Sequence, residues 1–204
     1  MFLEDLEALR IVRKIADYQF GRGVGEKLFP EGCVVVRSKK TGRPKYIYLD
    51  GKILATVRSS DGFMALTIHG GLRLSEILDY PKFRIVVYEK YVERILEMEI
   101  VRSRWVKIID SEIVPNDEVM VCCEEGELVG VGKAIVSAQT ISSSNNIVVA
   151  KIRHKVEKEH THKKKNTTSN HINTKKYSYI KQYTLNPQPS HTKKHLINKL
   201  SLKN

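Results

Sequence analysis

The sequence predicts an α+β fold: a small α/β module, then a β-barrel, then a disordered basic tail. Three observations support this prediction. Apolar residues open the chain at helical spacing, β-branched and aromatic runs separated by turn residues follow, and residues 155–204 contain few aliphatic side chains. The 204 residues are enough for one large domain or two small ones.

The N-terminal part predicts two helices. Every third residue from Leu3 to Ile15 is apolar, which is close to the spacing of one helical face, and Gly21 ends the pattern. A shorter helix is expected over residues 23–29, because Pro30 cannot continue it. Gly21, Gly23 and Gly25 lack the preceding strand and the spacing of a nucleotide-binding turn, so we interpret them as a corner between the helices.

Strands follow over residues 34–36, 46–49 and 53–57, which are rich in β-branched and aromatic side chains. Asp50-Gly51 between the last two is typical of a hairpin turn that requires positive φ at both central residues. A helix over residues 72–78 is expected to end before Tyr80-Pro81, because proline restricts the residue that precedes it. The first module therefore covers residues 1–81.

The hydrophobic pattern changes after Pro81. We expect a helix over residues 88–98 and strands over residues 84–87, 105–109, 118–123, 128–137 and 147–154. Five short strands with one helix in so short a segment predict a small closed β-barrel over residues 82–154.

The charge of the chain is concentrated at its C-terminal end. The formal net charge is +12, from 35 Lys and Arg against 23 Asp and Glu. Residues 155–204 hold 12 Lys and 2 Glu and carry +10 of it, which leaves +2 for the rest. This segment has too little apolar surface to offset its backbone entropy, so we predict a disordered tail over residues 155–204. Its five histidines are irregularly spaced and fit a solvated tail better than a metal site.

Several classes of protein are not expected. No apolar run approaches the roughly 20 residues of a membrane helix, and residues 1–10 show no apolar core of a secretion signal. Three cysteines, two of them adjacent, do not form a disulfide framework, so we expect a reducing, cytoplasmic location. No spacing of His and Cys typical of a metal site occurs, and the sequence predicts no cofactor.

No catalytic residue is predicted. The pairs Asp110/Glu112 and Glu124/Glu125 lie at strand ends or turns without a neighbouring histidine or nucleophile, which favours solvated turn acids. Cys122 and Cys123 alternate along a strand, so one is expected to face the core and the other to face outward. An enzyme that uses either thiol is the weakest hypothesis, because a nucleophilic thiolate needs a basic neighbour.

The basic side chains outside the tail are candidates for binding RNA. A strand–turn–strand connection holds Lys39, Lys40, Arg43 and Lys45, and the sequence alone favours a phosphate-binding loop and a solubilising loop equally. Lys90 and Arg94 lie four residues apart on one helical face. Arg102 and Arg104, followed by Lys107, are expected to share a strand face and to form a basic groove with that helix. Glu97 and Glu99 lie near enough to neutralise these arginines instead.

The order of several short motifs resembles the C-terminal part of archaeal archaeosine tRNA-guanine transglycosylases. In the first module these are Asp17-Tyr18-Gln19-Phe20-Gly21, Leu28-Phe29-Pro30, Ser38-Lys39-Lys40-Thr41-Gly42-Arg43, Ile47-Tyr48-Leu49-Asp50-Gly51 and Asp61-Gly62. In the second they are Pro115-Asn116-Asp117-Glu118-Val119, the stretch 126–134 and the stretch 149–154. The resemblance implies a pre-PUA module followed by a PUA β-barrel, which in that family grip tRNA, the PUA domain holding the acceptor stem and 3′ end.

Two departures from the family matter. Only about 14 residues precede the resemblance, whereas the catalytic TIM barrel of the family needs about 250. The resemblance therefore implies no transglycosylation by this chain alone. Residues 97–100 contain two acids where family members have glycine, which argues against close phosphate contact at that point.

The sequence therefore favours a non-catalytic RNA-binding protein, with tRNA as its RNA and a separate transglycosylase catalytic chain as its partner. The alternative is a protein-interaction or ribosome-biogenesis adaptor whose PUA barrel docks rRNA or a partner protein. Affinity for phosphates falls steeply with salt, so salt dependence distinguishes RNA binding from an apolar protein interface.

Overall fold

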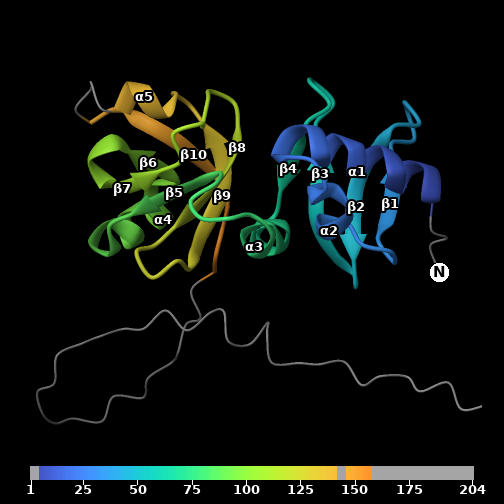
Figure 1. The fold of residues 1–204 in the computed structure, drawn as a ribbon, viewed down its shortest axis with the longest axis horizontal. Coiled ribbons are helices and arrows are strands. Elements are labelled where there is room, and N and C mark those ends of the chain that lie inside the picture. The colour runs from blue at the N-terminus through green and yellow to red at the C-terminus, as the bar shows by residue number, and fades with distance from the viewer. Residues whose placement is uncertain (1–4, 142–145, 158–204) are drawn as a thin grey trace, which may run out of the picture. The chain divides into compact units, whose positions relative to one another are not determined.

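A computed structural model describes residues 5–141 and 146–157. These residues contain a four-stranded sheet in the order β1-β2-β3-β4 and a six-stranded sheet in the order β6-β10-β9-β8-β5-β7, with helices packed beside both (Figure 1). The mixture of helices and strands confirms the predicted α+β fold. Beyond residue 157, the predicted tail lies outside the described residues.

The first module begins with helices α1 (Leu6–Phe20) and α2 (Val24–Leu28). The carboxylate of Asp5 caps α1 by accepting a hydrogen bond from the backbone N–H of Ala8 at 2.9 Å. The glycine run forms the predicted corner. A Cβ at Gly25 would lie 2.1 Å from the carbonyl oxygen of Arg13, so this close contact between the two helices requires glycine.

The two helices lie against an antiparallel sheet of β1 (Val34–Arg37), β2 (Pro44–Leu49), β3 (Lys52–Val57) and β4 (Met64–Leu66). Their shared core includes Leu9, Phe20 and Ile47, all at most 2% exposed. Asp50 and Gly51 both have positive φ, at 49° and 75°, as the hairpin prediction requires.

Helix α3 (Ile68–Ile77) connects the two modules. The hydroxyl of Thr67 caps it by accepting a hydrogen bond from the backbone N–H of Gly70 at 3.3 Å. The same hydroxyl donates to the carbonyl oxygen of Ile53 in β3 at 2.5 Å, which ties the start of α3 to the sheet. The chain then passes the cis peptide bond Tyr80–Pro81 into the second module.

In the second module, a six-stranded sheet curls into a half-barrel. Strand β5 (Arg84–Val87) pairs in parallel with β8 (Glu118–Cys122), and the remaining strand pairs are antiparallel. The other strands are β6 (Ile100–Arg102), β7 (Val106–Ile109), β9 (Leu128–Ala134) and β10 (Val148–Lys155). Strands β6 and β7 are the ends of the hydrogen-bonded order, so hydrogen bonds between strands do not close the predicted barrel into a ring.

Short helical segments complete this module. A 3₁₀ turn over Glu89–Tyr91 precedes α4 (Val92–Met98), and α5 (Ala138–Ile141) follows β9. A second 3₁₀ turn, Ser103–Trp105, separates β6 from β7. The expected strand over residues 105–109 therefore starts one residue later, and a three-residue strand precedes it.

This break corrects the expectation that Arg102 and Arg104 share a strand face. Arg102 ends β6, whereas Arg104 lies inside the 3₁₀ turn. Ser103 causes the break: its N–H donates to the carbonyl oxygen of Ile147 at 2.9 Å, and its hydroxyl accepts from the N–H of Ile147 at 3.2 Å. These bonds hold the chain at the end of β10 and turn the next residues away from the sheet.

The two modules share one hydrophobic core. Gly71 of α3 faces β9, and a Cβ at this position would lie only 2.4 Å from Cγ1 of Val131. Met120, Cys122 and Leu128 of the second module belong to the same buried cluster as Leu9 and Phe20 of the first. The residues between the modules are therefore packed as a protein interior rather than as a linker.

The connection after α3 is fixed by a buried arginine. Arg84 is 6% exposed. Its guanidinium donates hydrogen bonds to the carbonyl oxygens of Ser75, Leu78, Asp79 and Lys82. The bonds to Ser75 and Leu78 satisfy carbonyl groups at the C-terminal end of α3, and those to Asp79 and Lys82 hold the segment that follows it.

Because of this packing, we expect Gly71→Ala to destabilise the protein by about 1–3 kcal/mol. The added methyl group must displace Val131, and this cost exceeds the helix propensity of about 1 kcal/mol gained by replacing glycine. Chemical denaturation measures the change. Glu76→Ala on the exposed side of α3 is the matched control and should alter stability by less than about 0.5 kcal/mol. An unchanged or more stable Gly71→Ala protein would contradict the close contact.

Candidate nucleic-acid interface

The predicted basic loop is a tight turn between β1 and β2. The N–H groups of Ser38 and Gly42 donate to the carbonyl oxygens of Arg43 and Ser38, both at 2.8 Å, which closes the turn. The predicted cations are exposed: Lys39, Lys40 and Arg43 in the turn and Lys45 at the start of β2. None of them forms an ion pair with another residue of 5–141 or 146–157.

The neighbouring Arg37 has a structural role instead. Its guanidinium binds the carboxylate of Asp5 at 2.5 Å and that of Glu7 at 3.3 Å. The hydrogen bond from Arg37 is the main cause that lowers the pKa of Asp5 to about 2. Arg37 therefore connects β1 to the start of α1.

In the second module, three cations surround a pair of stacked aromatic rings. Tyr91 and Trp105 stack with ring centroids 5.7 Å apart and an angle of 29° between their planes. The guanidinium carbons of Arg94 and Arg104 each lie 5.9 Å from the Trp105 ring, and the Lys90 ammonium lies 5.1 Å from the Tyr91 ring. We call these five residues the Trp105 cluster. The structure thus brings Lys90, Arg94 and Arg104 together, although Arg104 comes from the 3₁₀ turn and not from a strand face.

Trp105 positions Arg94 and Arg104, but its own ring is buried and cannot contact a ligand. It is 1% exposed, and its indole N–H is buried without a hydrogen-bond partner in the described part of the chain. Cation–π contact with a fixed ring restricts where a guanidinium lies while leaving its N–H donors free. Lys90, Arg94 and Arg104 are exposed, and none of them is in an ion pair within the described ranges.

Arg102 and Lys107 lie outside the Trp105 cluster and have other partners. Arg102 donates to the carbonyl oxygen of Asn146 at 3.1 Å. Lys107 forms an ion pair with Glu124 at 2.6 Å, and this contact raises the pKa of Lys107. The second oxygen of Glu124 accepts from the backbone N–H of Glu89, which together with Lys107 lowers the pKa of Glu124. The charge of Lys107 is therefore largely neutralised.

Glu97 and Glu99, at the end of α4, form no ion pair with Arg102 or Arg104 in the described residues. Glu99 ends the helix in the left-handed conformation, with φ of 56°, which glycine adopts most easily. Its carboxylate binds the ammonium of Lys155 at 2.7 Å, and Lys155 also donates to the carbonyl oxygen of Leu96 at 2.8 Å. In the described residues, neither Glu97 nor Glu99 pairs with Arg102 or Arg104, so that alternative is wrong. Lys155, which sequence analysis assigns to the tail, is the last residue of β10.

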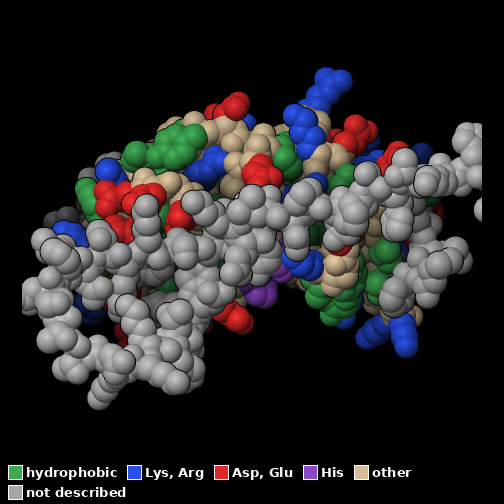
Figure 2. All heavy atoms as spheres, turned by 90° about the horizontal axis from the view of Figure 1, so that it is seen from below, with side chains coloured by type: hydrophobic (Ala, Val, Ile, Leu, Met, Phe, Trp, Pro, Cys, Tyr) green, Lys and Arg blue, Asp and Glu red, His purple; other side chains and the backbone are tan. Residues whose placement is uncertain are grey.

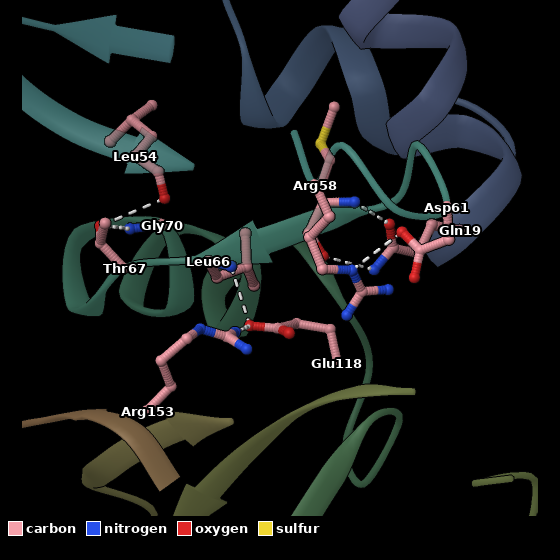
Figure 3. A network of polar contacts seen from close by, with 10 residues as sticks. Gln19, Leu54, Arg58, Asp61, Leu66, Thr67, Gly70, Glu118 and Arg153 are labelled. Carbon is pink, nitrogen blue, oxygen red and sulfur yellow. Dashed lines mark hydrogen bonds and ion pairs between the residues drawn. The ribbon is translucent and has the colours of Figure 1, made fainter. Parts of the chain in front are cut away.

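The carboxylate of Glu118 is buried between the two modules. Glu118 is 1% exposed, and its Oε1 accepts hydrogen bonds from the N–H of Leu66 at 2.8 Å and from the guanidinium of Arg153. Burial raises the pKa of Glu118, and Arg153 opposes this effect. In Figure 3, the Glu118 carboxylate lies between the guanidinium groups of Arg153 and Arg58. These contacts explain the buried acid as a connection between β4, β8 and β10.

The cysteines and turn acids show no arrangement for catalysis. Cys122 and Cys123 are 1% and 6% exposed, so the expectation that one of them faces outward is wrong. Burial raises the pKa of the Cys122 thiol to about 12 and also raises that of Cys123. Asp110 is 8% exposed and accepts from the N–H groups of Phe83 and Glu112 at 2.7 and 3.0 Å, so it fixes a turn but is not the solvated acid that the sequence predicted.

Sequence reasoning missed the aromatic part of the Trp105 cluster. It predicted a helix over residues 88–98, which includes Tyr91, and placed Trp105 at the start of a strand. One signal was available, since the only tryptophan of the chain is adjacent to Arg104. On the face seen in Figure 2, Lys and Arg side chains form several separate groups with Asp and Glu between them.

Within residues 5–141 and 146–157, no three His, Cys, Asp or Glu side chains are grouped so that they could hold a metal ion. No helix there has the length and apolar character needed to cross a membrane.

The fold and the cluster define the class of protein. The curled sheet of the second module, with α4 between its first strands, is a PUA domain: residues 83–156 match the PUA family. Residues 10–81 match the family described as the patch-forming domain C2 of tRNA-guanine transglycosylase. The chain therefore combines a transglycosylase-type C2 domain with a PUA domain, and these are the domains of the resemblance, which is confirmed.

Individual relatives agree with this assignment. The tRNA-guanine(15) transglycosylase of Methanothermobacter thermautotrophicus is 34% identical over 151 residues, which cover 74% of this chain and 23% of that protein. The enzyme of Pyrococcus abyssi is 40% identical over 132 residues, which cover 65% of this chain and 22% of that protein. The chain thus spans about a quarter of the length of these relatives, and the similarity covers their C-terminal region and not the catalytic barrel.

Solved structures share the fold. A hypothetical protein from Pyrococcus horikoshii superposes with a TM-score of 0.59 at 21% identity, covering 75% of this chain and 92% of that one. A conserved PUA domain protein from Thermoplasma acidophilum has a TM-score of 0.54 at 20% identity, covering 78% and 94%. The arrangement of the two modules therefore recurs in other chains.

We expect the buried cysteines to resist alkylation in the folded protein. With a pKa of about 12, about one Cys122 in ten thousand is a thiolate at pH 8. Iodoacetamide at pH 8, followed by mass spectrometry, should leave Cys122 and Cys123 unmodified in the native state. The same protein in denaturant is the control and should be modified at both. Rapid modification of either thiol in the native protein would revive the hypothesis of a cysteine enzyme.

Proposed function

We propose that this chain binds RNA without catalysing a reaction on it. The observation that carries the proposal is the Trp105 cluster, where three exposed cations are held on aromatic rings of a PUA domain and form no ion pair within the described residues. Free cations at fixed positions are suited to phosphate oxygens, which supply most of the affinity in protein–nucleic acid complexes.

We further propose that the RNA is tRNA, bound at its acceptor stem and 3′ end in connection with tRNA modification. The relatives that match both modules are tRNA-guanine(15) transglycosylases. An A-form acceptor stem has a major groove too narrow for side chains, so recognition is expected to depend on shape, backbone and the unpaired 3′ end.

The loop between β1 and β2 supplies the second set of phosphate contacts in this proposal. Lys39, Lys40 and Arg43 are exposed on the turn between the two strands, and Lys45 is exposed at the start of β2. We assign smaller roles to Arg102 and Lys107, because each already has a partner within the protein.

Transglycosylation requires a catalytic domain that the similarity does not cover. We therefore propose that the chain acts with a separate tRNA-guanine transglycosylase catalytic chain, for which it would hold the tRNA. Such a role places the protein in the cytoplasm with its tRNA substrate.

We expect Arg104→Ala to weaken tRNA binding by about 1–2 kcal/mol, the value of one charge-assisted contact. Arg94→Ala should have a similar effect, and both losses should shrink as salt rises from about 50 to 200 mM. Electrophoretic mobility shift or fluorescence anisotropy measures the affinity, and circular dichroism checks the fold. Arg22→Ala, an exposed cation at the corner between α1 and α2, is the matched control. Full affinity of the Arg94→Ala/Arg104→Ala double mutant would move the binding site to the β1–β2 loop.

The acceptor-end assignment is tested separately with tRNA that lacks its 3′ terminal nucleotides. We expect weaker binding of this shortened tRNA, because the unpaired end is the part that side chains can reach. Equal affinity for both tRNAs would refute the acceptor-end assignment while leaving RNA binding in place. Weak, salt-independent binding to every RNA would favour the adaptor hypothesis instead.

Residues 158–204 hold 11 Lys and 1 Glu, so their removal takes away a charge of +10. We expect truncation after Glu157 to lower the affinity for all RNAs alike and to reduce the salt dependence of binding, because lysines act as point charges without fixed geometry. The cut must follow Lys155, which contacts Glu99 and Leu96. A truncated protein that discriminates less well between tRNA and other RNAs would contradict this prediction.

A further inference from the structure

Tyr18 is an exposed aromatic side chain outside the sites described above. It lies near the end of α1 and is 81% exposed, the largest value among the large hydrophobic side chains in the described residues. Its ring stacks nearly parallel on that of Phe63, with centroids 6.0 Å apart and planes at 10°. The Phe63 ring therefore supports the Tyr18 ring, and Tyr18 remains open to solvent.

The turn between β3 and β4 holds Phe63 in place. The carboxylate of Asp61 accepts from the N–H of Phe63 and from Nε of Arg58, both at 3.0 Å. The backbone of Arg58 also bonds to both Phe63 and Gly62, whose φ of 78° makes the turn sharp. Figure 3 shows Asp61 beside Arg58 at this turn. The aromatic pair is therefore arranged before any ligand binds.

A hollow of about 580 Å³ lies beside this pair. Ile11 and Ile15 of α1 supply apolar surface, and Arg10 and Lys14 supply positive charge. In the part of the chain that the structure describes, Arg10 has no hydrogen-bond or ion-pair partner. Lys14 has a 78% exposed side chain and reaches only Asp17, at 4.0 Å. Asp61 also lines the hollow, but Arg58 neutralises it.

We propose that this hollow binds one nucleotide of a single-stranded RNA segment, with the base stacked on Tyr18 and the phosphate bound by Arg10 and Lys14. The inference rests on the proposed RNA-binding function and adds a second, single-strand contact in the first module. Aromatic rings stack with any base, so the site is expected to prefer single strands over duplexes without reading sequence.

The chemistry of the hollow favours a nucleotide. Its volume lies in the range of small-molecule sites and exceeds what one apolar side chain of a peptide would fill. A flat exposed ring next to the cations of Arg10 and Lys14 matches a planar base joined to an anionic phosphate.

Affinity of the full chain for a six-nucleotide single-stranded RNA and for a short RNA duplex tests the proposal. We expect Tyr18→Ala to weaken binding of the single strand about tenfold, the effect of losing one base–aromatic stack, and to leave duplex binding unchanged. Tyr18→Phe should retain the affinity, since it keeps the ring. Arg10→Ala/Lys14→Ala should weaken single-strand binding in a salt-dependent manner. Leu6→Ala, another exposed apolar residue on α1, is the matched control and should have no effect.

The outcomes distinguish this inference from the proposed function. If the wild-type chain binds tRNA but Tyr18→Ala and Arg10→Ala/Lys14→Ala leave single-strand binding unchanged, the nucleotide site is refuted and the proposed function stands. If these variants lose a protein partner while single-strand binding remains, the hollow is a protein interface and the inference is again wrong. If the wild-type chain binds no RNA at all, both proposals fail.

Discussion

The carboxylate of Glu118 connects the two modules that carry the surfaces proposed to bind RNA. It reaches from β8 to the backbone N–H of Leu66 in β4 and to the guanidinium of Arg153 in β10. An unpaired buried charge costs several kcal/mol of folding free energy. Glu118 therefore stabilises the fold only when both Arg153 and the N–H of Leu66 in β4 contact it. Around them, Gly71 packs against Val131 without space for a methyl group. Polar and apolar contacts thus favour the same arrangement of α3, β4, β8 and β9.

The sequence predicted those parts of the fold that are determined locally. The hairpin at Asp50-Gly51 and the end of α1 at Gly21 follow from backbone conformations that few residues adopt. Strands β4 and β6 were missed because each has three residues and exists only through pairing with distant segments. The break after β6 depends on a hydrogen bond between Ser103 and Ile147, which are 44 residues apart, and no local pattern contains that information.

The features of the candidate site also divide into those that local sequence predicts and those that depend on distant contacts. Lys90 and Arg94 both lie at rings of the Trp105 cluster, but Lys90 belongs to the 3₁₀ turn before α4 and not to the helical face that the spacing predicted. Whether a cation is free depends on partners elsewhere in the chain: Lys107 meets Glu124 and Arg102 meets Asn146, at separations of 17 and 44 residues. The stacking of Tyr18 on Phe63 likewise joins α1 to a turn between two strands. Charge patterns therefore identify candidates, and tertiary packing decides which of them remain available.

The available cations differ in how much freedom they lose on binding, and this difference assigns them different roles in the proposed RNA complex. Arg94 and Arg104 rest on a buried ring, so part of their conformational entropy is already lost in the free protein. A planar guanidinium at a set position also favours particular phosphate geometries. The lysines of the β1–β2 loop have no such support, apart from the contact of Lys45 with Tyr46 at 4.7 Å. We infer that the loop adds affinity and speeds association with any polyanion, whereas the Trp105 cluster provides the selection between RNA shapes.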